Sequence, residues 1–380
     1  MHFMFAAGFR PFFLLAAAWA AIAVPVWLTA YVHGYALRGP LPALFWHGHE
    51  MVFGFGLAAV AGFLLTAIPN WSGRLPARGA PLAALALLWL AGRVAVLAAG
   101  AIGAAAAALV DLAFPAALTG VVARELVAGR NWRNLPMLAA LALLFSGSAM
   151  VHLHALDIAY LAPEGIRLGI ATLCMLIALV GGRLVPSFTR NWLAKAHRAL
   201  PGPEGALDRM ALLITLLALA SWVLGATFSS WLLLAAGIAL AARLSRWRGH
   251  ATLREPLLFI LHLGYGWLAL GLILLGLEPR STAALHALAV GAIGTMTLAV
   301  MTRTSLGHTG RARVADRPTV AIYCLVTLAA LLRIAGAFAG AQAVLVTSLA
   351  GLAWSAAFAT FVLHYGSLLI GARPSHEKTA

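Results

Sequence analysis

Long apolar runs separated by short polar stretches cover almost the whole chain. Twelve of these runs approach or exceed the roughly 20 residues that an α-helix needs to cross a bilayer. The polar stretches between them are too short to form domains of their own. The pattern therefore predicts an all-α polytopic membrane protein, with twelve transmembrane helices in a single integral membrane domain over residues 1–380. The expected spans are 11–32, 46–68, 80–99, 101–123, 135–156, 165–186, 207–227, 229–245, 256–277, 281–304, 319–338 and 341–369.

Similar sequences recur along these helices at a spacing of about 115–120 residues, which suggests an internal repeat. The second, sixth and tenth helices run in the same direction and are expected to end in related polar turns. Arg93 in LWLAGRVAVL is matched 240 residues later by Arg333 in LAALLRIAGAF. We interpret the chain as a three-fold pseudo-repeat of four helices. The related turns begin at Pro69 (PNWSGR), Thr189 (TRNW) and Thr302 (TRT).

Composition supports a membrane protein, because 63% of the residues are hydrophobic and only 10% are charged. The net charge of +15 does not indicate a nucleic-acid partner, since the basic residues lie in short loops and form no continuous basic face. With twelve spans, 21 of the 26 basic residues fall on one side. The positive-inside rule then places that side and both termini in the cytoplasm. The two cysteines form no disulfide framework or Cys-based metal motif.

The histidines are the residues of this sequence that indicate a metal or haem site. Of the thirteen histidines, six lie toward the outer side of the membrane, more than packing requires, and His262 lies in the inner half of its helix. Neutral imidazole is a common ligand of iron and copper, and haem iron is often held by histidine. We therefore expect a haem or copper site, although any single histidine can instead be a hydrogen-bonded contact between helices. The outer six are His33, His47, His49, His152, His154 and His286.

The spacing of the histidines limits how they can share an ion. His47 and His49 are two residues apart, about 200° around a helix, so both can face one ion only if the helix is irregular. His152 and His154 have the same spacing. Glu50 either orients a ligand through a hydrogen bond or pairs with an outer arginine.

Two arginines lie inside apolar runs, each in the outer half of its helix. Arg93 and Arg333 have no acid nearby in the same helix. A buried guanidinium needs an anionic or carbonyl partner, so we expect these arginines to hold haem propionates or a small anion. The alternative is that each extends to the interface. Asp111 is on the same side and is a candidate partner for either arginine.

Six stretches resemble the NnrS family, from the first expected helix to the end of the tenth. The longest and most specific is HALAVGAIGTMTLAVMTRTSLGHTGR at 286–311. The other five are GFRPFFLLAA (8–17), WHGHEMVFGF (46–55), GFLLTAIPNWSG (62–73), GGRLVPSFT (181–189) and HLGYGWLALGL (262–272).

The resemblance implies a bacterial inner-membrane protein with haem and copper that responds to nitric oxide, in nitrosative stress or denitrification. Its expected partners are the lipid bilayer and nitric oxide or nitrosylated iron. The resemblance implies no settled enzymatic activity, and we name no catalytic residue. The positions that match family motifs are His47, His49, Glu50, His152, His262, His286 and Arg93.

Three other interpretations of the sequence give the protein a different function. The arrangement also resembles the catalytic subunit of haem-copper oxidases, but Leu168 to Val185 contains no histidine, so we do not predict oxygen reduction. The main alternative is a proton-coupled secondary transporter of a small anion, with the buried histidines and arginines as its path. A third interpretation is an assembly partner of a respiratory complex, without a cofactor of its own.

Overall fold

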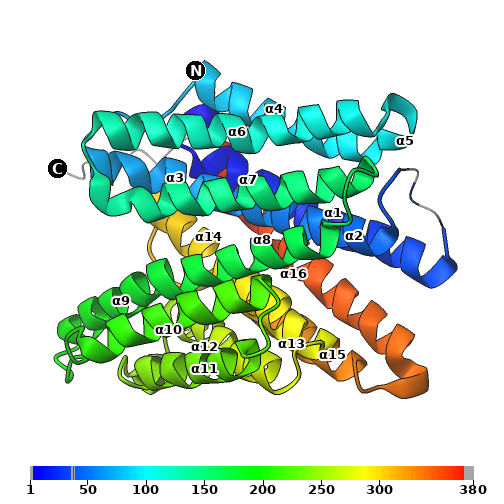
Figure 1. The fold of residues 1–380 in the computed structure, drawn as a ribbon. Helices are drawn as coiled ribbons and strands as arrows, with labels where there is room; N and C mark the ends of the chain where they lie inside the picture. Colours follow the sequence, from blue (N-terminus) through cyan, green and yellow to red (C-terminus); the bar gives the residue numbers. More distant parts are fainter. Residues whose placement is uncertain (1–2, 36, 38, 372–380) are drawn as a thin grey trace. The chain divides into compact units, whose positions relative to one another are not determined.

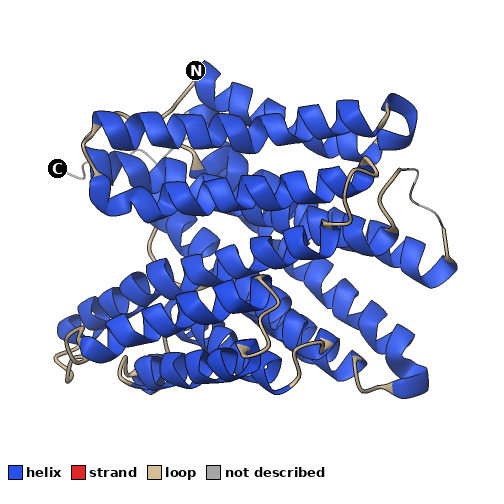
Figure 2. Cartoon of the chain, in the orientation of Figure 1, coloured by secondary structure: helices blue, strands red, loops and turns tan. Residues whose placement is uncertain are grey.

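The structure is a computed structural model that describes residues 3–35, 37 and 39–371. Figure 2 shows helices joined by short loops, and no strand occurs among the described residues. The predicted all-α fold class is confirmed. Within the described ranges, eleven helices are long and apolar enough to cross a membrane, and the shorter Ser229–Ser245 is the twelfth apolar helix.

Each predicted apolar run corresponds to a helix in Figure 1. The third and fourth runs are separate helices joined by the short α5, and the seventh and eighth separate between residues 223 and 229. The α-helices are α1 (Phe9–His33), α2 (Ala43–His49), α3 (Leu57–Ser72), α4 (Ala80–Leu97), α5 (Ala99–Ile102), α6 (Ala104–Ala128), α7 (Leu135–Ala155), α8 (Ala162–Leu176), α9 (Gly182–Lys195), α10 (Ala206–Val223), α11 (Ser229–Ser245), α12 (Pro256–Leu277), α13 (Thr282–His286), α14 (Thr295–His308), α15 (Arg317–Gly336) and α16 (Ala343–Ile370).

Three long helices contain a π-helical segment, in which the turn is wider than in an α-helix. The segments are η2 (Glu50–Gly56), η4 (Ile177–Gly181) and η6 (Ala287–Gly294). They join α2 to α3, α8 to α9 and α13 to α14. These are the same three helices that the sequence relates to one another. The three-fold repeat stays a prediction, and the shared π-helical segments are a structural parallel to it.

The sequence predicts that these helices end in polar turns. In the structure, most of each polar stretch instead belongs to the helix itself. Thr189 lies in the middle of α9, and Thr302 lies in the middle of α14. Pro69 lies inside α3, which continues to Ser72. A threonine can be placed inside the helix here because its hydroxyl finds an acceptor there. The Thr189 hydroxyl donates to the Val185 carbonyl at 2.8 Å. A polar sequence at the end of an apolar run was therefore a poor marker of the last helical residue.

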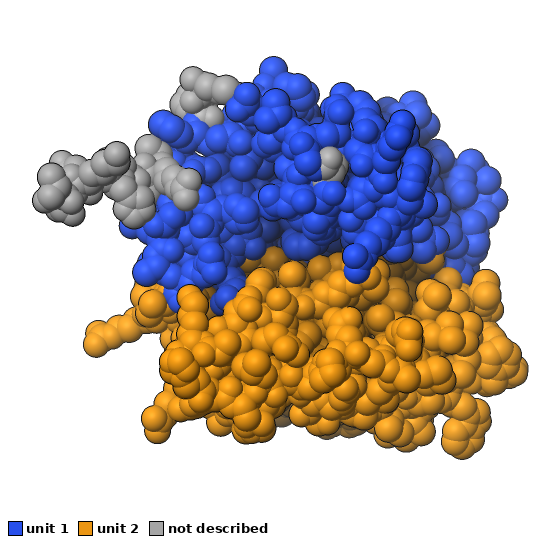
Figure 3. Space-filling view, turned by 90° about the vertical axis from the view of Figure 1, so that its left-hand side faces the viewer, with its two compact units in different colours: residues 1–166, 301–313, 358–380 blue, residues 167–300, 314–357 orange. Residues whose placement is uncertain are grey.

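The chain forms two compact units, which are coloured separately in Figure 3. Unit 1 comprises residues 1–166, 301–313 and 358–380, and unit 2 comprises residues 167–300 and 314–357. The single domain over residues 1–380 and the side of the membrane that each loop faces stay predictions. Arg38, Arg373 and Lys378, which contribute to the charge count, lie outside the described residues.

In unit 1, α1 packs against α3 and η2, and α6 packs against α3, α4 and α7. The beginning of α1 is held next to the end of α16 by Arg10, which is buried. Its guanidinium donates to the carbonyls of Leu369 at 2.9 Å and Gly371 at 2.8 Å. These bonds use backbone acceptors that a helix C-terminus leaves unsatisfied.

In unit 2, α11 packs between α10 and α12 and carries the buried Arg243. Its guanidinium donates to Asp208 Oδ1 at 2.9 Å and to the Tyr265 hydroxyl at 3.0 Å. It also donates to the carbonyls of Ala178 at 2.9 Å and Gly182 at 3.2 Å, at the π-helical segment η4. A single side chain therefore connects α10, α12 and the η4 region.

We expect Arg243→Met to destabilise unit 2, because it leaves Asp208 and two buried carbonyls without this donor. Removing one partner of a buried ion pair costs about 3–5 kcal/mol. The matched control is Arg246→Met, since the Arg246 side chain is 35% exposed and also contacts Asp208, at 3.0 Å. Thermal unfolding of the detergent-purified variants measures both effects. Equal midpoints for the two variants would contradict this assignment.

Candidate metal centre

Five helical segments of unit 1 bring five charged or titratable side chains together. His49 is the last residue of α2, and Glu50 is the first residue of η2. The other three come from α4, α6 and α7: Arg93, Asp111 and His152. None of the five is more than 4% exposed. So many buried polar groups within membrane-spanning helices are costly unless they pair with one another or bind a ligand.

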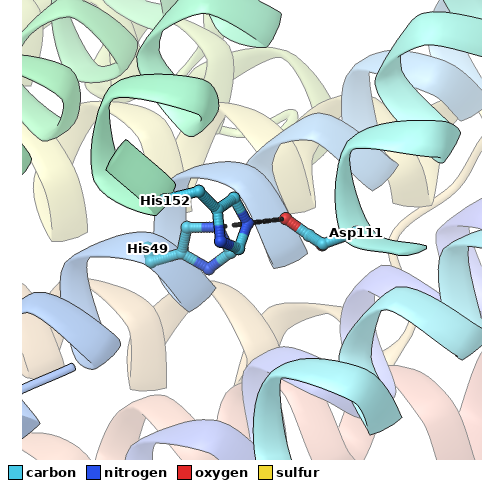
Figure 4. Close-up of side chains that lie close together, drawn as sticks. All are labelled: His49, Asp111 and His152. Atoms are coloured by element: carbon cyan, nitrogen blue, oxygen red, sulfur yellow. Dashed lines mark hydrogen bonds and ion pairs between the residues drawn. The ribbon is translucent and has the colours of Figure 1, made fainter. Parts of the chain in front are cut away.

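Asp111 directs its carboxylate toward both histidines, whose rings lie next to each other, as Figure 4 shows. Its Oδ2 atom is 2.8 Å from His152 Nε2 and 3.2 Å from His49 Nε2. The Ser148 hydroxyl also contacts Asp111 Oδ2 and His49 Nε2, in both cases at 3.3 Å. One carboxylate oxygen is therefore the meeting point of two imidazoles and a hydroxyl group.

Arg93 occupies the opposite side of the two carboxylates. Its Nη1 donates to Glu50 Oε2 at 2.5 Å, and its Nη2 pairs with Asp111 Oδ1. Trp19 Nε1 donates to the same Glu50 oxygen at 2.7 Å. Glu50 and Asp111 thus supply the anionic partners that the Arg93 guanidinium needs, and its expected role in holding a haem propionate or a small anion stays a prediction. The alternative that Arg93 extends to the interface is wrong, because the residue is 3% exposed.

Two glycines make room for this network. A Cβ atom on Gly54 would lie 2.8 Å from both Glu50 Oε2 and Trp19 Nε1, closer than real Cβ contacts. A Cβ atom on Gly92 would lie 2.9 Å from Asp111 Oδ1. The space beside these glycines is filled by the protein's own polar side chains. Glycine at these two positions therefore allows the helices to approach each other closely.

The π-helical segment explains how neighbouring residues reach one cluster. Adjacent side chains on a regular α-helix point about 100° apart. Here His49 and Glu50 meet directly, since His49 Nδ1 is 3.1 Å from Glu50 Oε1. The wider turn begins at Glu50, and such segments recur at functional sites.

The charges of the cluster do not balance. Glu50 and Asp111 carry two negative charges, and Arg93 carries one positive charge. His49 faces a carboxylate at each ring nitrogen, 3.1 Å from Glu50 Oε1 and 3.2 Å from Asp111 Oδ2. A neutral imidazole has one N–H, so one nitrogen would direct its lone pair at a carboxylate. The arrangement needs one further positive charge, which either a proton or a metal ion supplies.

The donor set fits a transition metal ion. One nitrogen of each histidine and one Asp111 oxygen lie within 4.8 Å of one another. Two ligands bound at about 2.1 Å from one ion are typically about 3–3.5 Å apart, close to the two observed separations of 2.8 and 3.2 Å. Two imidazoles and a carboxylate suit iron, copper or zinc. The buried cluster can therefore hold a metal ion.

The space beside these histidines is small on the side of His152. The described cavity that reaches His152 has a volume of about 90 Å³, whereas cofactor sites usually have about 300–1,000 Å³. Glu50 and Arg93 fill the other side of the cluster. The predicted haem stays a prediction.

The other predicted residues of unit 1 point elsewhere. His47 stacks on Trp27, with ring centroids 4.3 Å apart. His154 meets Tyr160 edge to face at 4.8 Å and Phe45 at 5.1 Å. Each is two residues from a member of the cluster, and the helical period turns it to a different neighbour.

Three predicted residues belong to unit 2. His262 is 5% exposed, and its Nε2 lies 2.9 Å from the Thr189 hydroxyl. His286 Nδ1 lies 2.7 Å from the Thr282 carbonyl, one turn earlier in α13. Arg333 lies in the last turn of α15 and is partly buried. Their roles as ligands or anion-binding groups stay predictions.

Asp111 is the central residue that the sequence did not assign as a ligand. The sequence indicates Asp111 only as a candidate partner for an arginine. The available signal was that Asp111 is the one acidic residue in its apolar run, 101–123. Ser148 and Trp19 gave no comparable signal, because hydroxyl and indole groups are common in membrane helices.

The comparisons with known proteins bear on the whole chain. The family described as NnrS protein matches residues 3–373. No curated protein matches the chain. The family match includes every helix of both units and all five members of the buried cluster. The chain therefore belongs to the NnrS family.

Proposed function

We propose that this protein binds a copper or iron ion through His49, Asp111 and His152, and that it acts in the bacterial response to nitric oxide. Membership of the NnrS family supports the biological role. The position of His49 between two carboxylates carries the proposal for the site, because that arrangement lacks one positive charge. A metal ion supplies that charge and uses the nitrogen lone pairs that the site presents.

Each residue of the cluster has a distinct part in this proposal. His49, Asp111 and His152 are the ligands. Glu50 accepts a hydrogen bond from His49 Nδ1 and so directs the Nε2 lone pair toward Asp111. Arg93 holds both carboxylates in place and offsets one negative charge. A copper or iron ion held by these three residues would supply coordination positions at which nitric oxide could bind.

The proposed location is the inner membrane, with both termini in the cytoplasm. The asymmetry of basic residues supports this orientation. It puts the start of α2 and the end of α7, and so the cluster, toward the periplasmic side. Nitric oxide or a nitrosylated iron species would then reach the site from the periplasm or from the outer leaflet.

The alternative is a proton-coupled transporter of a small anion. The buried network of two carboxylates, two histidines and Arg93 favours it, since such chains form proton relays in transporters. In proteoliposomes, an anion flux driven by a proton gradient and abolished by Asp111→Asn would support transport. A metal-loaded protein without flux would support the metal site.

We expect about one copper or iron ion per chain in detergent-purified protein, as three buried protein ligands predict. His49→Ala, His152→Ala and Asp111→Asn should each lose the ion, because each removes a ligand. His47→Ala and His154→Ala are matched controls two residues away and should keep it. Elemental analysis measures the ion, and size-exclusion chromatography confirms folding. Metal-free wild-type protein, or full occupancy in the double variant His49→Ala/His152→Ala, would refute the site.

We expect Gly92→Ala to lower metal occupancy without removing a ligand. Its added Cβ atom would lie 2.9 Å from Asp111 Oδ1 and displace that carboxylate. Gly120→Ala is the control on α6, where a Cβ atom has nothing within 4 Å. Metal titrations should show a loss of affinity of about tenfold to a hundredfold for Gly92→Ala alone. Equal affinities would show that the position of Asp111 does not matter.

In cells that lack their own copy of the gene, we expect the wild-type protein to restore growth under nitric oxide. His154→Ala should restore growth equally, whereas Asp111→Asn should not, because it removes the carboxylate that contacts both histidines. Immunoblotting of membranes controls for expression. Full protection by Asp111→Asn at equal expression would separate the biological role from the metal site.

A further inference from the structure

A small apolar cavity of unit 1 ends at the candidate metal centre. Its volume is about 90 Å³. It lies where α4 ends and α6 begins, next to α2 and the last turns of α7. His152 is the one titratable residue among the described residues that line it. The walls include Trp46, Val96, Leu97, Ala104, Ala107 and Ala155.

A wider and more open space of about 680 Å³ continues from this cavity. Five residues line both spaces, so the two adjoin: Gly39, Pro40, Leu97, Ala99 and Ala104. The wider space has no titratable residue among its described lining residues. Together they form an apolar path from the surface of unit 1 to His152.

The size and chemistry of the inner cavity define what it can hold. Small apolar cavities in proteins can bind xenon or small apolar molecules. An anion would lose its hydration there without gaining a partner, apart from His152 at the inner end. The cavity therefore favours a small uncharged molecule of a few atoms.

Alanines keep this space open. Ala104 and Ala107 lie one turn apart on the same face of α6, and both line the inner cavity. Ala107 is 2% exposed, and a larger side chain there would have to occupy the cavity. Ala105, between them, is exposed and does not line it.

We propose that this cavity is the binding and entry site through which a small uncharged diatomic gas reaches His152. The use of the gas at the cluster rests on the proposed metal function, whereas binding in the cavity does not. The volume left beside Ala104 and Ala107 limits the size of the molecule that can enter, and the apolar walls exclude anions. His152 is the cluster residue that meets the incoming molecule.

Xenon tests the cavity independently of any metal. In crystals of the full chain pressurised with xenon, the anomalous signal should place xenon beside Ala107 and His152. Ala107→Leu should remove the signal, because its side chain fills the space, and Ala105→Leu should keep it. Absence of xenon from the wild-type cavity would overturn the proposal, whether or not the protein binds metal.

Nitric oxide binding to metal-loaded protein tests the route. In stopped-flow measurements, Ala104→Leu and Ala107→Leu should slow association by about tenfold or more, at unchanged metal content. Ala105→Leu should leave the rate unchanged. Ala104 is partly exposed, so its variant should fold even if Ala107→Leu does not. An unchanged association rate in folded, metal-loaded Ala104→Leu would overturn the route. Metal-free wild-type protein would instead refute the proposed function and leave the xenon result to decide the cavity.

Discussion

The buried pairing of two carboxylates with Arg93 and His49 is the interaction on which the rest of unit 1 depends. Two carboxylates and one guanidinium lie within membrane-spanning helices, where an unbalanced charge is expensive. Helices α1, η2, α4, α6 and α7 each contribute a donor or acceptor to this network. The close approach at Gly54 and Gly92 follows from the same requirement, because the charged groups must touch in order to offset one another.

Unit 2 shows that a buried arginine alone does not indicate a metal site. Arg243 is as buried as Arg93, but its surroundings differ. Its acidic partner Asp208 also pairs with Arg246, so the local balance has no surplus of negative charge. Its remaining bonds go to backbone carbonyls and to the Tyr265 hydroxyl. The comparison separates an arginine that stabilises helix packing from one that pairs with two carboxylates beside two histidines.

The length of the apolar runs is sufficient to predict the helices, because a membrane span requires about twenty apolar residues whatever its neighbours are. The site was only partly predictable. His49, Glu50, Arg93 and His152 were recognised as unusual, since charge at lipid depth is visible in the sequence. The choice of His49 over His47, and the contact of Asp111 with two imidazoles, depend on helix packing and on the widened turn at Glu50. Neither is encoded in a regular period of 3.6 residues.

The π-helical segment Glu50–Gly56 makes the cluster sensitive to the number of residues in its helix. A π-helical turn contains one more residue than the α-helical turn it replaces. Deleting one residue from it would restore a regular helix and rotate the preceding residues by about 100° relative to α3. His49 would then leave Asp111, although every side chain of the cluster would still be present. The length of this helix, as well as the identity of its residues, therefore decides whether the cluster forms.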